Sequence, residues 1–127
     1  MRRRNGPGGI WGFFKLEEAM EINKQYLTIN NYSRPGNRRS KTTAVACHYI
    51  GNPGTSAQAN RNYFENLKDT HTAKASCHYI IGLHGEIIQL IPEEEISWCT
   101  NQANSYTISI EACHPDESGH FTDVTYQ

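Results

Sequence analysis

A single histidine stands where α/β proteins often place reactive side chains. His48 ends the strand-like run 42–48 and comes just before a turn at 51–54. Strand ends that face loops carry the sites of many α/β folds. A neutral imidazole at such a point can bind a metal ion, although a lone histidine is more often structural. By position alone, both readings of His48 stay open.

Glu111 is the second candidate. It lies within the run 107–113, where apolar and polar residues alternate and so point to opposite faces of a sheet. Burying a carboxylate without a partner costs free energy. Glu111 is therefore either a general base in a cleft or an edge-strand residue that faces water.

Two further side chains each have a structural and a functional interpretation. His78 lies in a predicted strand and is either a hydrogen-bonded, half-buried residue or a catalytic one. Trp98 lies in an irregular segment and belongs either to the core or to a stacking surface for a sugar or peptide. We predict surface positions for the other histidines, which are His71, His84, His114 and His120.

Other common motifs are absent from the sequence. It has no phosphate-binding glycine loop, no Gly-x-Ser-x-Gly elbow and no pair of histidines with the spacing of a helical zinc site. A metal site would therefore have to combine residues that are far apart in the sequence.

The elements that must position these side chains follow from the periodicity of the sequence. It predicts a buried strand at 42–48 and further strands at 76–82, 86–91 and 107–113, with a hairpin turn at 83–85. A helix begins after a cap at Thr55 or Ser56 and runs through Lys68. Residues 21–41 are predicted as a lead-in that ends in an exposed basic stretch, residues 96–106 as irregular, and residues 121–127 as the opening of a helix capped by Thr122 or Asp123.

Composition limits the possible functions. The 127 residues are enough for one domain, and the formal net charge of -1 argues against binding nucleic acid through phosphate neutralisation. No apolar run approaches the roughly 20 residues needed for membrane insertion, and we expect a monomer. None of the four cysteines forms a Cys-x-x-Cys pair, so we expect buried, reduced thiols.

The first 19 residues differ from the rest. Their short apolar run is interrupted by Gly12 and followed by charged residues, which does not match a signal peptide. We interpret 1–19 as a non-native or disordered leader, with translation starting at Met20 in the cytoplasm.

Three sequence segments resemble segments of the type 2 N-acetylmuramoyl-L-alanine amidases and occur in the same order; they are 47–57, 75–89 and 105–116. This family is related to the peptidoglycan recognition proteins. The resemblance covers about residues 21–127 and looks closest to endolysins of bacterial viruses and prophages. It implies an α/β fold, a central mixed sheet flanked by helices, with 20–127 as the N-terminal part of a catalytic domain.

The resemblance also implies roles for single residues. His48 matches the first ligand of a Zn²⁺ ion, and Glu111 matches the general base that activates water. The implied reaction is hydrolysis of the amide between N-acetylmuramic acid and L-alanine in peptidoglycan, at the bacterial cell wall. His78 matches a histidine of the cleft wall, and Trp98 and Cys99 fall among the substrate-binding positions.

The sequence departs from the family pattern in two places. Cys99 stands where the family commonly has a cleft-lining histidine. The family's other two zinc ligands follow a long C-terminal helix, beyond the point that corresponds to Gln127. We thus expect the fold to lack this helix and the segment with the last ligands, so that one of three zinc ligands is present. We therefore expect weak zinc affinity and no amidase activity in this chain. The alternatives are a non-catalytic peptidoglycan-binding module and an inactive prophage remnant.

Overall fold

The computed structural model describes residues 21–127. The leader predicted at 1–19 and the start predicted at Met20 lie outside the described residues.

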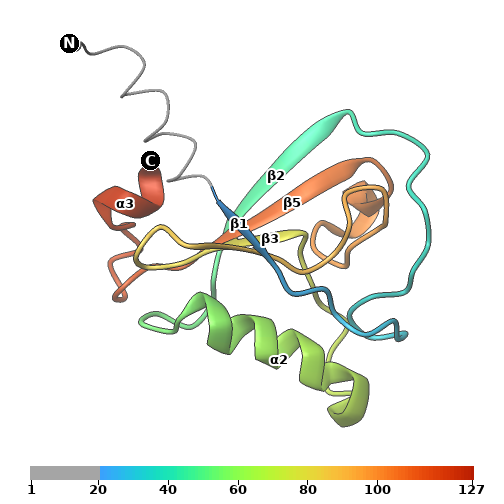
Figure 1. Cartoon of the computed structure of the whole chain (residues 1–127), viewed down its shortest axis with the longest axis horizontal. Coiled ribbons are helices and arrows are strands. Elements are labelled where there is room, and N and C mark those ends of the chain that lie inside the picture. The colour runs from blue at the N-terminus through green and yellow to red at the C-terminus, as the bar shows by residue number, and fades with distance from the viewer. Residues whose placement is uncertain (1–20) are drawn as a thin grey trace, which may run out of the picture.

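Five strands form one mixed sheet (Figure 1). Across the sheet the order is β1-β4-β3-β5-β2, and the β3–β4 pair is antiparallel while the other three pairs are parallel. This arrangement confirms the predicted α/β fold with a central mixed sheet. The strands are β1 (Ile22–Lys24), β2 (Ala44–Tyr49), β3 (Tyr79–Ile81), β4 (Ile87–Gln89) and β5 (Thr107–Ala112).

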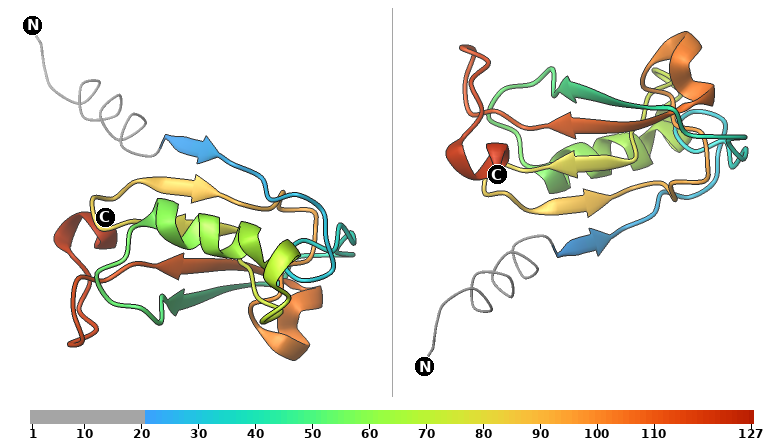
Figure 2. Two further views of the ribbon diagram at one scale, coloured as in Figure 1. Left: turned by 90° about the horizontal axis from the view of Figure 1, so that it is seen from below. Right: turned by 90° about the horizontal axis from the view of Figure 1, so that it is seen from above.

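The predicted helix is α2 (Ala57–Thr70), which crosses one face of the sheet and contacts β3 and β4 (Figure 2). Ser56 caps its start, because the Ser56 side chain accepts a hydrogen bond from the Ala59 amide at 3.0 Å. At the other end His71 adopts the left-handed conformation and stacks on Tyr32, with 4.1 Å between ring centroids. Both ends of α2 are therefore fixed by local contacts.

The predicted hairpin between β3 and β4 is present. The Gly82 amide donates to the Glu86 carbonyl at 2.8 Å, and Gly85 adopts a φ of +82° that favours glycine. The short helix α3 (Asp123–Tyr126) is capped by Thr122, as predicted. It packs on this hairpin turn through a hydrogen bond from the Thr125 hydroxyl to the Gly82 carbonyl at 3.0 Å.

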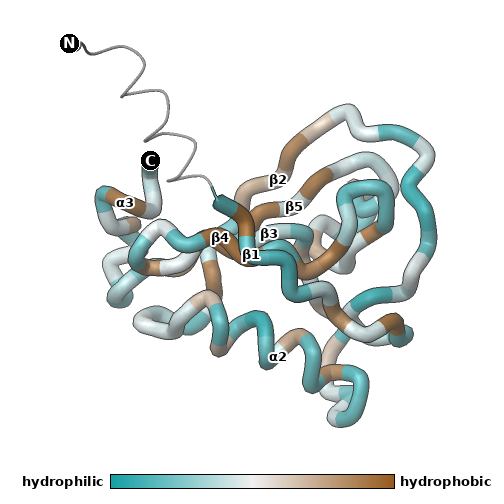
Figure 3. Tube along the Cα trace, in the orientation of Figure 1, coloured by the Kyte–Doolittle hydropathy of each residue, from teal (hydrophilic) through white to brown (hydrophobic). Residues whose placement is uncertain are grey.

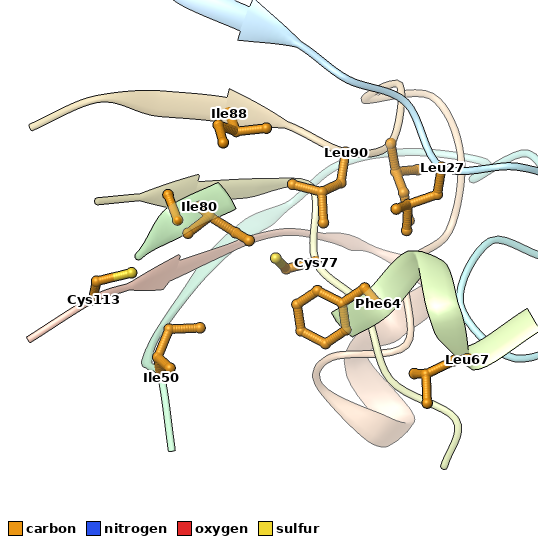
Figure 4. Close-up of a cluster of buried hydrophobic side chains, with 11 residues drawn as sticks. Leu27, Ile50, Phe64, Leu67, Cys77, Ile80, Ile88, Leu90 and Cys113 are labelled. Atoms are coloured by element: carbon orange, nitrogen blue, oxygen red, sulfur yellow. The ribbon is translucent and has the colours of Figure 1, made fainter. Parts of the chain in front are cut away.

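The core lies between α2 and the middle of the sheet (Figure 4). Phe64 and Leu67 of α2 pack with Ile80, Ile88 and Leu90. Figure 3 shows the same division along the chain, since the strands carry most of the apolar segments and α2 alternates between polar and apolar residues. Within residues 21–127, no helix combines the length and the apolar character required to cross a membrane.

The structure differs from the sequence predictions in three elements. β2 was predicted to be buried, but it is an edge strand whose residues are mostly exposed. Cys47 within it is exposed, whereas Cys77 and Cys113 are buried as expected. Strand β1 and the 3₁₀ helix η1 (Asn101–Ser105) were not predicted, because each is short and lacks a clear periodicity.

Candidate metal and catalytic site

The pairing of β2 with β5 brings the two principal candidates together. His48 and Glu111 are direct partners in the parallel register of these strands. Partners in a parallel pair point to the same face of the sheet, so the imidazole and the carboxylate become neighbours. Both residues lie near the carboxyl ends of their strands, the edge where open α/β sheets usually bind ligands.

Cys99 joins this pair from the loop that precedes η1. Its thiol donates a hydrogen bond to Glu111 Oε2, with 3.5 Å between sulfur and oxygen. Asn104 fixes the loop, because its side-chain oxygen accepts from the backbone amides of Cys99 at 3.1 Å and Thr100 at 2.7 Å. The thiol therefore reaches the site from a loop that is held by its own hydrogen bonds.

Burial controls the protonation of the two acidic groups. Partial burial raises the pKa of Glu111 above its ordinary value of 4.5, although the hydrogen bond from Cys99 and the nearby His48 oppose this shift. Burial, together with the charge of Glu111, raises the pKa of the Cys99 thiol to about 12. Without a bound cation, Cys99 is thus a neutral thiol that donates to Glu111.

The three residues meet the requirements of a small metal site. One ligand atom each from His48, Cys99 and Glu111 can be chosen so that all lie within 4.8 Å of one another. Imidazole nitrogen, thiolate sulfur and carboxylate oxygen are the donors that zinc uses in proteins. The residues present therefore fit a zinc ion at this edge of the sheet.

Comparison with known proteins identifies the family. Residues 38–127 match the N-acetylmuramoyl-L-alanine amidase family. The chain belongs to this family. A probable N-acetylmuramoyl-L-alanine amidase of Bacillus licheniformis is 28% identical over 90 residues, which are 71% of this chain and 25% of that protein. The chain spans 19–29% of the length of the curated relatives that it matches.

Solved structures agree with this assignment. A mutant endolysin from Bacillus subtilis is 26% identical to this chain. Its superposition gives a TM-score of 0.63 and covers 75% of this chain and 62% of the endolysin. PlyL, whose structure is solved, is also 26% identical in sequence. Its superposition gives a TM-score of 0.65 and covers 84% of this chain and 64% of PlyL. The likeness thus extends over most of this chain and part of each relative.

The amidase resemblance places His78 in the wall of a substrate cleft, and this role stays a prediction. The structure buries His78 completely. The Ser109 amide donates to His78 Nδ1 at 3.0 Å, so the proton is on Nε2, which donates to the Glu95 carbonyl at 2.8 Å. Burial lowers the pKa of His78, which agrees with a neutral ring. In the described structure His78 is an interior residue that links β5 to the segment around Glu95.

Trp98 is half-buried, so its position is compatible both with a core residue and with a stacking surface for a sugar or peptide. The Lys74 ammonium lies over the indole ring, 6.0 Å from its centroid. Indole Nε1 is buried without a hydrogen-bond partner among the described residues. The backbone of Trp98 pairs with Ser76 in both directions, at 3.0 Å each. A substrate-binding role for Trp98 stays a prediction.

Three polar residues that support the site region were missed from the sequence. Asn104 holds the Cys99 loop, and Arg39, predicted in a solvated stretch, is largely buried against the Glu95 carbonyl at 2.8 Å. His114, predicted at the surface, is buried with its ring nitrogens 2.7 Å and 2.8 Å from the carbonyls of Ile50 and Asp116. Periodicity carries no signal for such contacts, because they depend on the course of irregular loops and not on the spacing of apolar residues.

Proposed function

We propose that the protein hydrolyses the amide between N-acetylmuramic acid and L-alanine in peptidoglycan, in a zinc-dependent reaction at the bacterial cell wall. Residues 20–127 would belong to its catalytic domain. The pairing of His48 with Glu111 in register is the observation that supports this proposal most directly. Membership of the amidase family supports the bond class, and the likeness to endolysins favours a viral or prophage origin.

The two residues have separate roles in this proposal. His48 would hold zinc, which when bound polarises a carbonyl and makes a nearby water more acidic. Glu111 accepts the proton of the attacking water and passes it to the leaving amine of L-alanine. Its half-buried position suits this role, because burial raises the pKa of the carboxyl above 4.5 and so helps it retain a proton between the two transfers.

The test uses the protein as expressed from its own gene, incubated with purified cell walls and Zn²⁺. Hydrolysis of the proposed bond exposes new N-terminal alanine and leaves the number of reducing sugar ends unchanged. We expect Glu111→Gln to lower the rate by roughly 10²–10⁴-fold, the usual contribution of a general base. His48→Ala should cause a comparable loss that added Zn²⁺ does not restore.

Matched controls are available on the surface. Glu94→Gln and His84→Ala change exposed residues of the same types and should keep the wild-type rate. Circular dichroism verifies that each variant is folded. Failure to expose N-terminal alanine would contradict the proposal. Sedimentation with intact walls without cleavage would instead favour the binding-module alternative, and neither binding nor cleavage would favour the remnant.

A further inference from the structure

We propose that His48, Cys99 and Glu111 together form a three-donor site for one divalent transition-metal ion, with Cys99 as a thiolate ligand. This donor set differs from the one that the family resemblance implies, in which His48 is the only ligand among these three and Glu111 is the general base. Here Glu111 binds the metal through one carboxylate oxygen, and its second oxygen stays available to accept a proton. The proposal goes beyond amide hydrolysis and does not depend on it.

The distances require only a small adjustment. With zinc bonds of about 2.0–2.3 Å, neighbouring donors of a tetrahedral site lie about 3.4–3.8 Å apart. Cys99 Sγ and Glu111 Oε2 are already 3.5 Å apart, and the whole set lies within 4.8 Å. Closure of about 1 Å is therefore enough. His48 can supply it, because its side chain is exposed on the edge strand β2.

Charge also favours a divalent cation at this point. A neutral imidazole, a thiolate and a carboxylate carry two negative charges between them, which balance one M²⁺ ion. On binding, a metal–sulfur bond forms and the proton of the Cys99 thiol goes to solvent. No oxidation or reduction takes place. The mixed nitrogen, sulfur and oxygen donors favour zinc or cobalt over magnesium or calcium, which prefer oxygen ligands alone.

The surroundings hold the backbones of all three donors in place before a metal arrives. Asn104 fixes the backbone of Cys99 and Thr100, and the paired strands β2 and β5 set the separation of His48 and Glu111. Such supporting contacts reduce the ordering cost of metal binding. The remaining coordination position would be open to solvent or to a substrate atom.

The test follows Co²⁺ binding to the metal-free 127-residue chain by absorption spectroscopy. A cysteine thiolate bound to cobalt gives a near-ultraviolet charge-transfer band that nitrogen and oxygen ligands do not give. We expect one Co²⁺ per chain with this band, displaced by added Zn²⁺. Cys99→Ser should remove the band and weaken binding by at least about tenfold, within the range seen when metal-site partners are lost. His48→Ala and Glu111→Gln should also weaken binding.

Cys47→Ser is the matched control, because Cys47 precedes His48 in β2 and is exposed. It should keep both the band and the affinity. X-ray absorption of the zinc-loaded wild-type chain tests the ligands without any substitution, and one sulfur at about 2.3 Å is expected. A band that survives Cys99→Ser, or a zinc shell without sulfur, would overturn the proposal. Cobalt binding through Cys99 without wall hydrolysis would reject the proposed function alone, and hydrolysis without a thiolate band would reject only this site.

Discussion

The structure predicts different reactivities toward alkylating reagents for the thiols of Cys47 and Cys99. The thiol of Cys47 is exposed in β2, whereas burial and Glu111 raise the pKa of Cys99 to about 12. Thiolates are the reactive form of cysteine. In metal-free protein at about pH 8, we expect iodoacetamide to modify Cys47 at least about ten times faster than Cys99.

Peptide mass spectrometry over a time course measures both rates in one sample. Cys47→Ser should remove the fast reaction and leave the slow ones unchanged. Labelling of Cys99 as fast as that of Cys47 would contradict the burial and charge described for the candidate site.

Single residues also show how far sequence reasoning reaches. His48 and Glu111 could be selected because strand ends and alternation are local patterns, and the structure does bring them together. The nearness of Cys99 to Glu111 could not be predicted, because it depends on the course of an irregular loop. The complete burial of His78 could not be predicted for a related reason, since it depends on contacts with Ser109 and the carbonyl of Glu95.

At the level of elements, an ion pair joins two loops beside the sheet. Arg34 donates two hydrogen bonds of 2.8 Å to the carboxylate of Glu95, and both side chains are largely buried. The hydrogen bonds from Arg34 lower the pKa of Glu95 below its ordinary value of 4.5. A lowered pKa in the folded state stabilises the fold above the ordinary pKa, and this gain is lost as the pH falls through the folded value.

We therefore expect Glu95→Gln to reduce the free energy of unfolding by about 1–2 kcal/mol at about pH 7. The difference from wild type should shrink as the pH falls below 4.5. Urea denaturation at a series of pH values measures it, with the exposed Glu94→Gln as the control. A difference that stays constant with pH would show that the ion pair is not its source.

The helices and strands were predicted correctly where the local sequence pattern is strong. The helix α2 was predicted well because Ser56 caps it and its apolar residues recur at helical spacing. β2 was predicted as a buried strand from its small and β-branched residues, but those residues do not reveal whether a strand is central or at an edge. Strand β1 pairs with β4 over only three residues, which is too short for alternation to be recognised.

For the molecule as a whole, stability depends on the single core between α2 and the sheet. Leu90 is fully buried in it, and its backbone joins two segments, since its amide donates to His78 and its carbonyl accepts from Leu27. We expect Leu90→Ala to lower the free energy of unfolding by about 2–5 kcal/mol, the usual cost of a core cavity. Ile29→Ala, at a position that is 61% exposed, should change it by no more than about 0.5 kcal/mol.

Chemical denaturation of the two variants and the wild type measures these differences. Equal losses from both variants would mean that the apolar cluster around Leu90 does not carry the stability assigned to it.

The parallel pairing of β2 with β5 has a consequence for the order in which the molecule is built. The β3–β4 hairpin and α2 join residues that are close in sequence and can form early. By contrast, His48 meets Glu111 only after the chain between them has closed into a long loop, which costs conformational entropy before any contact repays it. We therefore expect the pair of His48 and Glu111 to form later in folding than α2 and the β3–β4 hairpin.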